Sequence, residues 1–250
     1  MNKTFLFIGH RGCRTDFIDE NSLTAFQKAI KYGANYIEFD VRKTKDNLII
    51  AMHDETLNRT INHSGRVKDF YYHELKNFKM SKRKENIPQL SEILKIFKGK
   101  VKYMIDLKEK KIASDVITLV ANQNLINDCI FSGRSVLELI AIKKKFPESK
   151  ICYNITKGHD IKIEDFLEYS NQDLKFPYEI DMISLKSDVI TSKFIETCHK
   201  NNILALSWDF YNYSNPLEMI KDLILKGIDG ILFDNYKNIP KIKHWLKNKY

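Results

Sequence analysis

Residues 35–41 read NYIEFDV, a short run in which apolar and acidic side chains alternate. On a β-strand, residues two apart share a face, so Ile37 and Phe39 are expected on one side and Glu38 and Asp40 on the other. If the apolar side packs against helices, the two carboxylates point into the interior of the sheet, where an uncompensated charge is costly. The run therefore predicts a strand whose inner face needs a counter-charge.

Strand-like apolar runs of this length recur along the whole chain and alternate with helical patterns. The strand-like runs are TFLFIG, NYIEFDV, NLIIAMH, VKYMIDL, DCIFSG, KICYNI, IDMISL, ILALSW and DGILFD, and the helical patterns fall at about 22–33, 89–98, 111–123, 135–146, 161–168, 191–201, 215–226 and 238–247. Eight or nine strands alternating with helices over 250 residues predict an α/β protein with a closed (β/α)₈ TIM barrel. No linker divides the chain, so residues 1–250 are expected to form one domain.

One region breaks this alternation. Residues 54–88 are long and polar, and they contain the stretches HSGR and YYHELKNF. Loops of this length inside a domain are usually functional or disordered. We interpret residues 54–88 as an insertion, or cap, over one mouth of the barrel.

The composition limits the classes of partner and compartment. The net charge of +9 suits an anionic partner, which could be a phosphorylated metabolite, a lipid head group or nucleic acid. The lysines are spread along the chain without an aromatic-interleaved basic stripe, so we expect solvated surface and no nucleic-acid partner. Four scattered cysteines without a CxxC spacing favour neither a zinc site nor a disulfide framework.

The N-terminal segment MNKTFLFIGH has an apolar run too short for a signal-peptide core or a membrane span. We therefore expect a cytoplasmic protein without stable membrane insertion. The oligomeric state is not indicated by the sequence.

A second strand repeats the acidic pattern. In VKYMIDLKEK, which begins at Val101, Asp106 and Lys108 share one face. Carboxylates from two strands would then meet near the C-terminal ends of the strands, which is the catalytic face in barrels of this class. Carboxylate oxygens without a nearby cysteine suit a hard cation such as Mg²⁺ or Ca²⁺.

An ion-paired network is the alternative to a metal site. On the first strand alone, a network of Glu38, Asp40 and Arg42 explains the pattern equally well. The second strand, together with His10 and His53 at strand ends, favours a metal-dependent phosphoryl site.

These pieces, taken in order, resemble the glycerophosphodiester phosphodiesterase family, whose fold is a (β/α)₈ barrel. The matching pieces are HRG at 10–12, EN at 20–21, EFDV at 38–41, HD at 53–54, IPQLSEIL from Ile87, IDLK at 105–108, Trp208 after a late strand, and GIDGILFD near the end. The resemblance covers essentially the whole chain, and its N-terminal motifs are the more specific.

The resemblance implies metal-dependent hydrolysis of a small-molecule glycerophosphodiester to glycerol 3-phosphate and an alcohol. It also implies roles for seven residues at matching positions. These are His10 and His53 as general acid and base, Arg11 and Lys108 as phosphate-binding cations, and Glu38, Asp40 and Asp106 as ligands of a divalent metal, Mg²⁺ or Ca²⁺. Imidazoles suit the first role because their ordinary pKa lies near 6.5.

Two departures from the family pattern concern the metal site and the alcohol pocket. The family usually has Glu where this chain has Asp106. In the family, the tryptophan is usually followed by Thr, an apolar residue and Asn, whereas this chain reads WDFYN from Trp208. Recognition of the alcohol is therefore expected to differ more than the reaction type. The aromatic and basic side chains of residues 54–88 are expected to close over that alcohol.

Other polar residues have two interpretations each. Glu20, beside Asn21 and Ser22, either belongs to a helix cap or contacts the metal or the His10 loop. Trp208 is either core or pocket wall. Asp54 and Asp234 are interpreted as structural residues that fix loop ends.

The adjacency of His10 and Arg11 predicts diverging side chains. At the end of a strand, His10 is expected to face the barrel axis, while Arg11 reaches a phosphate from the rim.

Two alternative functions stay open at this point. One is a phosphodiester lyase that ends at a cyclic phosphate, similar to phosphatidylinositol-specific phospholipases or spider-type sphingomyelinases. The other is a non-catalytic barrel that binds an anion, which is disfavoured because the set of candidate catalytic residues is complete.

Overall fold

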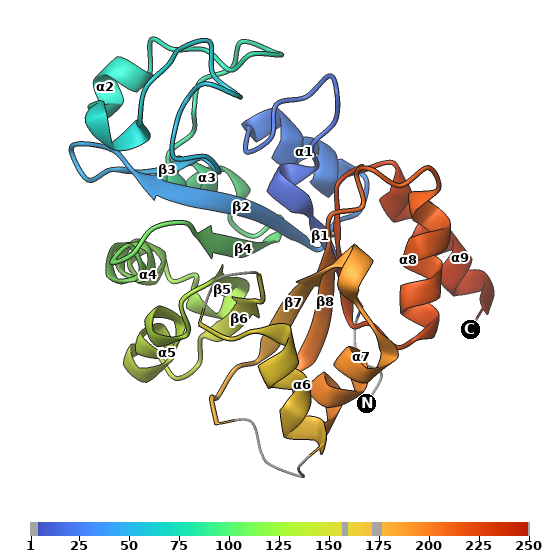
Figure 1. Cartoon of the computed structure of the whole chain (residues 1–250). Helices are drawn as coiled ribbons and strands as arrows, with labels where there is room; N and C mark the ends of the chain where they lie inside the picture. The colour runs from blue at the N-terminus through green and yellow to red at the C-terminus, as the bar shows by residue number, and fades with distance from the viewer. Residues whose placement is uncertain (1–4, 157–159, 172–176, 250) are drawn as a thin grey trace.

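Parallel strands close into a barrel in the computed structural model, which describes residues 5–156, 160–171 and 177–249 (Figure 1). The barrel strands are β1 (Leu6–Gly9), β2 (Tyr36–Lys43), β4 (Lys102–Leu107), β5 (Cys129–Gly133), β6 (Lys150–Asn154), β7 (Met182–Lys186), β8 (Leu204–Trp208) and β9 (Gly230–Phe233). Each pairs in parallel with its neighbours, and β1 closes the ring by pairing with both β2 and β9. The predicted (β/α)₈ barrel is confirmed. Thr4, expected at the start of the first strand, lies outside the described residues.

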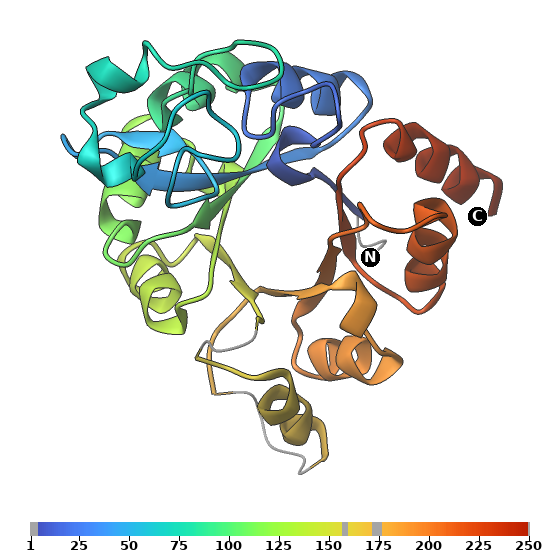
Figure 2. The same cartoon turned by 45° about the horizontal axis from the view of Figure 1, so that its top comes forward.

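Helices surround the barrel on its outer side (Figure 2). They are α1 (Leu23–Lys31), α3 (Leu90–Phe97), α4 (Ala113–Asn122), α5 (Val136–Lys145), α6 (Ile163–Asn171), α7 (Ser192–Lys200), α8 (Pro216–Leu225) and α9 (Asn238–Lys249), with short 3₁₀ turns η1 (His10–Gly12), η3 (Ile126–Asp128) and η4 (Ser187–Val189). Each predicted helix is present within a few residues of its expected bounds.

The strands carry two different faces. Outward residues such as Ile37 and Phe39 belong to the large core between strands and helices, where Phe39 packs 5.5 Å from the ring of Phe26 in α1. Inward residues, including Ile8 and Met104, form a separate apolar cluster that fills the barrel. Polar inward side chains such as Asp40 and Asp106 lie in the C-terminal halves of their strands.

The strand-like run NLIIAMH forms β3 (Ile49–Ala51), but β3 is not a barrel strand. It runs antiparallel to β2, with Val41 opposite Ala51. The chain reverses at 44–48, where the amide of Thr44 donates to the carbonyl of Leu48. Two parallel strands must be joined by a long crossover connection. The reversal between β2 and β3 is too short for one, so β3 pairs antiparallel with β2 and is not one of the barrel strands.

The region between β3 and α3 carries a small core of its own. It contains η2 (Val67–Asp69) and α2 (Tyr72–Leu75) and lies over β2 and β3 at one side of the mouth (Figures 1 and 2). Its buried apolar cluster consists of Ile50, Met52, Leu57, Ile61, Val67, Tyr72, Leu75, Met80 and Ile87. The amides of Lys82 and Arg83 donate to Asp19, which attaches the region to the loop before α1.

Candidate active site

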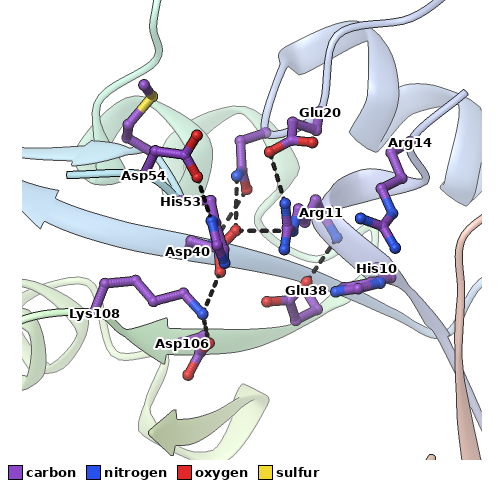
Figure 3. Close-up of polar contacts among 12 residues, drawn as sticks. His10, Arg11, Arg14, Glu20, Glu38, Asp40, His53, Asp54, Asp106 and Lys108 are labelled. Atoms are coloured by element: carbon purple, nitrogen blue, oxygen red, sulfur yellow. Dashed lines mark hydrogen bonds and ion pairs between the residues drawn. The ribbon is translucent and has the colours of Figure 1, made fainter. Parts of the chain in front are cut away.

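A pocket opens at the C-terminal ends of the barrel strands. Its lining residues are His10, Arg11, Glu38, Asp40, His53, Met104, Asp106, Lys108, Ser132, Arg134, Asn154, Thr156, Ser184, Trp208 and Leu232. All seven residues to which the sequence assigns a catalytic, phosphate or metal role line this one pocket, as Figure 3 shows for its polar part.

Three buried carboxylates form the floor of the site. Glu38 and Asp40 come from β2, and Asp106 comes from β4 at the position that pairs with Asp40. One oxygen of each carboxylate lies within 4.8 Å of an oxygen of the others. A set of buried oxygen donors at this spacing fits a hard divalent cation.

Lys108 and Arg11 are the side-chain cations that face these carboxylates (Figure 3). The Lys108 Nζ lies 2.8 Å from the Asp40 Oδ1 and also contacts the Asp106 Oδ2. The Arg11 Nε lies 3.4 Å from the Asp40 Oδ2. Arg42 turns away, donating to the carbonyl of His53 and pairing with Glu109. The alternative network of Glu38, Asp40 and Arg42 is therefore wrong, because β2 twists Arg42 toward the neighbouring loops.

The pKa values show which carboxylate lacks compensation. Burial alone would raise the pKa of Asp40, but Lys108 and Arg11 hold it well below its usual range. Burial, followed by the charges of Asp40 and Asp106, raises the pKa of Glu38 well above its usual range. Burial opposes the charge of Lys108, yet Asp106 and Asp40 raise its pKa above the ordinary value. Negative charge thus exceeds positive charge around Glu38, which supports the fit of a cation.

Asp106 is held by neutral side chains of the next two strands. Its Oδ1 accepts from Ser132 Oγ at 3.2 Å and from Asn154 Nδ2 at 2.9 Å. Ser184 in turn donates to the Asn154 Oδ1 at 2.6 Å. This chain of contacts fixes the shorter aspartate side chain from one side, while Lys108 contacts it from the other.

The HRG motif forms a tight turn and does not extend β1. Arg11 has φ 52° and Gly12 has φ 79°, and a Cβ on Gly12 would lie 2.6 Å from the ring of Phe26. Glycine is required there because both the backbone angle and the close helix exclude a side chain. The turn lets the Arg11 amide donate to Glu38 at 2.6 Å.

The expectation that Arg11 reaches in from the rim is wrong. Arg11 is only 8% exposed, and its guanidinium donates to the Glu20 Oε1 at 2.8 Å while its Nε faces Asp40. The left-handed backbone turn redirects the side chain inward, toward the acidic cluster.

His10 is positioned by a carboxylate from the opposite end of the sequence. Its Nδ1 lies 2.8 Å from the Asp234 Oδ1, which also accepts from Arg14 Nε at 2.7 Å. The other oxygen of Asp234 accepts from the amide of Phe210 at 2.7 Å. Burial alone would raise the pKa of Asp234, but His10 and Arg14 hold it below its usual range. With Nδ1 engaged, Nε2 is the ring nitrogen left for proton transfer.

His53 has a carboxylate partner next to it in sequence. Its Nδ1 lies 2.6 Å from the Asp54 Oδ1, and Asp54 also accepts from Arg59. Burial lowers the pKa of His53 below that of a free imidazole, although Asp40 acts in the opposite direction. Asp54 keeps a pKa of about 2 because Arg59 and His53 outweigh its partial burial.

Glu20 and Trp208 lie at the edge of the site. Glu20 stands outside the group of three carboxylates and joins Arg11 to Arg59, which donates at 2.6 Å to the Glu20 Oε1. The half-buried Trp208 lines the pocket, with its ring 6.3 Å from that of His10. Ser22 is the residue whose side chain caps α1.

The sequence interpretation missed the partners of the two histidines. Asp54 and Asp234 are interpreted from the sequence as fixing loop ends; Asp234 does accept from the amide of Phe210, and both aspartates also contact an imidazole. Arg14, which donates to Asp234, was not singled out, and Asn21 was placed in the EN motif and at the helix start without its contact to Asp40. The sequence did carry a signal for such a partner, namely an aspartate directly after an apolar strand-like run, as in GILFD.

Comparison with known proteins agrees with this geometry. The model of the Glycerophosphoryl diester phosphodiesterase family matches residues 10–238. The chain is 28% identical over 249 residues to a glycerophosphodiester phosphodiesterase of Caldanaerobacter subterraneus subsp. tengcongensis, covering 92% of this chain and 94% of that protein. It is 26% identical to one of Bacillus altitudinis, covering 99% of this chain and 100% of the other.

Solved structures share the fold. A glycerophosphodiester phosphodiesterase from Thermotoga maritima superposes with a TM-score of 0.77 at 25% identity, covering 97% of this chain and 100% of that one. A phosphodiesterase from Oleispira antarctica, solved with the product sn-glycerol-3-phosphate, gives a TM-score of 0.76 at 19% identity, covering 97% and 96% of the two chains. Among the described residues, no helix has the length and apolar character needed to cross a bilayer.

Proposed function

Because this chain belongs to the glycerophosphoryl diester phosphodiesterase family and is thereby a phosphoric diester hydrolase, we propose that it cleaves glycerophosphodiesters to glycerol 3-phosphate and an alcohol in a metal-dependent reaction. The observation that carries the proposal is the convergence of three buried carboxylates, two cations and two carboxylate-held histidines on one pocket.

His10 and His53 form the acid–base pair. Each ring is oriented through Nδ1 by an aspartate, which leaves Nε2 available for proton transfer. His53, whose charged form is disfavoured by burial, accepts the proton of the nucleophile. His10 donates a proton to the departing oxygen, as a positioned general acid does.

Arg11 and Lys108 bind the reacting phosphate. Both are buried beside the acidic cluster and keep their positive charge there. Glu38, Asp40 and Asp106 would hold the divalent ion, Mg²⁺ or Ca²⁺. When bound, that ion would add positive charge against the charge that builds on the phosphoryl oxygens.

The region 54–88 acts as a cap over the alcohol side of the substrate. Its Arg59 contacts Glu20 and its Asp54 contacts His53, so the cap is joined to the loop before α1 and to the histidine side of the pocket. Trp208, at the edge of the same pocket, supplies an apolar wall.

Release of glycerol 3-phosphate from a panel of glycerophosphodiesters tests the proposal. The assay should be run on EDTA-treated protein and after addition of Mg²⁺, Ca²⁺ or Mn²⁺. We expect release only with a divalent ion. Full turnover by the metal-free protein would contradict the metal dependence, and release of no phosphomonoester from any member would contradict the hydrolysis.

Phosphorus NMR of the products separates hydrolysis from the lyase alternative. A monoester signal is expected for the final product. A cyclic phosphate that accumulates without further hydrolysis would instead identify a lyase that uses the neighbouring glycerol hydroxyl as its nucleophile.

A further inference from the structure

Among the described residues, Arg134 differs from Arg11 and Lys108, the other basic side chains of the pocket, because it has no anionic partner. It directly follows β5, two residues after the inward-facing Ser132, so it stands on the same inner face nearer the mouth. Within the part of the chain that the structure describes, its side chain makes no ion pair, and its Nε is shielded from solvent without a hydrogen-bond acceptor. Arg11 and Lys108, by contrast, both form ion pairs with carboxylates, although the Arg11 Nε likewise has no hydrogen-bond acceptor.

A second polar group without a hydrogen-bond partner among the described residues lines the same pocket. Thr156 continues the inner face of β6 two residues beyond Asn154, and its buried Oγ1 also has no partner among the described residues. A shielded donor without an acceptor is costly. Arg134 and Thr156 are therefore two polar residues of the pocket lining that each carry a shielded polar atom without a partner among the described residues.

Arg134 also lines a groove that leads outward from the site. Only His53, Lys108 and Arg134 line both the pocket and this groove. The remaining groove residues come mainly from the segments after β4 and β5. His10, Arg11 and the three buried carboxylates are absent from this lining, so the groove extends outward from the Lys108 side of the proposed phosphate position.

The charge of the groove favours an anion. One oxygen of each of its three carboxylates already has a partner. Glu109 pairs with Arg42, Glu138 accepts from the amide of Lys111, and Asp160 accepts from the amide of Val136. The guanidinium of Arg134 is the contrasting case, since it is a fork of donors suited to a carboxylate or phosphate, and its Nε has no acceptor among the described residues.

We propose that Arg134, assisted by Thr156, binds a negatively charged group, a carboxylate or a phosphate, carried by the alcohol part of the diester. This subsite rests on the proposed hydrolysis of glycerophosphodiesters and names the class of alcohol that the chain prefers. Arg11 and Lys108 hold the phosphate that reacts, and Arg134 holds the second anion at the entrance of the groove.

Two pairs of substrates test the subsite. Glycerophosphoserine and glycerophosphoethanolamine differ only by a carboxylate, and glycerophosphoglycerol phosphate and glycerophosphoglycerol differ only by a phosphate. The quantity measured is the ratio of kcat/KM within each pair. The wild type should favour the anionic member, and Arg134→Gln should reduce that ratio about tenfold or more, mainly through KM.

Two further variants serve as controls. Arg134→Lys keeps the charge without the guanidinium fork, so it should retain part of the preference and shows that the position tolerates substitution. Lys144→Gln removes one positive charge from the exposed side of the following helix α5 and should keep the wild-type ratios.

The ratios measured for Arg134→Gln distinguish a subsite for the alcohol from contact with the reacting phosphate. Collapse of one ratio supports the subsite and identifies the anion as the carboxylate or the phosphate. Unchanged ratios in Arg134→Gln, or an equal loss on all four substrates, would overturn the subsite, since equal loss means contact with the reacting phosphate. Cleavage of none of the four by the wild type would overturn the proposed function and the subsite with it.

Discussion

Asp234 orients a histidine at the far end of the chain, and this contact leads to the first prediction. His10→Ala should lower kcat by roughly 10²- to 10⁴-fold with little change in KM if His10 is a general acid. Asp234→Asn keeps the shape of the side chain and should cause a smaller loss, on the order of tenfold to a hundredfold, because the imidazole loses its orientation.

Kinetics and melting curves recorded together check this expectation. A purely structural His10 would show the reverse pattern, with a lowered Tm and nearly normal turnover of the folded protein. That result would remove the contact between His10 and Asp234 from the mechanism.

At the scale of the elements, the region after β3 behaves as a small unit with its own core. Leu57 is fully buried in that core, away from the barrel filling. Leu57→Ala should cost about 2–5 kcal/mol of local stability, as large-to-small changes at buried sites do. Hydrogen exchange should accelerate across residues 54–88 and stay nearly unchanged in β5 to β8.

The matched control for that prediction lies in the barrel. Ile130 belongs to the apolar filling inside the strands, and Ile130→Ala should accelerate exchange in the barrel strands themselves. If Leu57→Ala instead loosened all strands equally, the region 54–88 would be part of the cooperative barrel unit.

For the whole molecule, a bound divalent ion should stabilise the fold. Three buried carboxylates face too little positive charge, and a ligand that binds only the folded state raises stability by mass action. Saturating Mg²⁺ or Ca²⁺ should raise Tm of the EDTA-treated protein by several degrees. Asp40→Asn should lose this shift, and an equal shift in the variant would contradict the assigned ligands.

The whole molecule should also lose stability in acid. The pKa of Asp54 is about 2 in the folded protein, and that of Asp234 lies below its usual range. The unfolded chain therefore binds more protons as the pH falls below about 4, and folding loses these contributions progressively toward pH 2. Urea unfolding at pH 6, 4 and 3 should show the stability difference between wild type and Asp234→Asn narrowing, whereas a constant difference would contradict the assignment.

Local rules were enough to predict the strands, the helices and the inward carboxylates. A strand alternates its faces every residue, so the run NYIEFDV already placed Glu38 and Asp40 opposite Ile37 and Phe39. The same rule placed Asp106 with Lys108. Motif order then indicated the family, because the spacing of HRG, EFD, HD and IDLK is a property of the sequence alone.

The partners of these side chains depended on how the barrel closes. His10 meets Asp234 across 224 residues because β1 and β9 are neighbours in the closed sheet. Lys108, not Arg42, neutralises Asp40 because register and twist decide which cation faces inward. Such contacts lie between segments remote in sequence, and no local pattern encodes the register that joins them. The lack of a partner for the Arg134 Nε among the described residues has the same origin, since only the packed neighbours show which polar atoms remain without a partner.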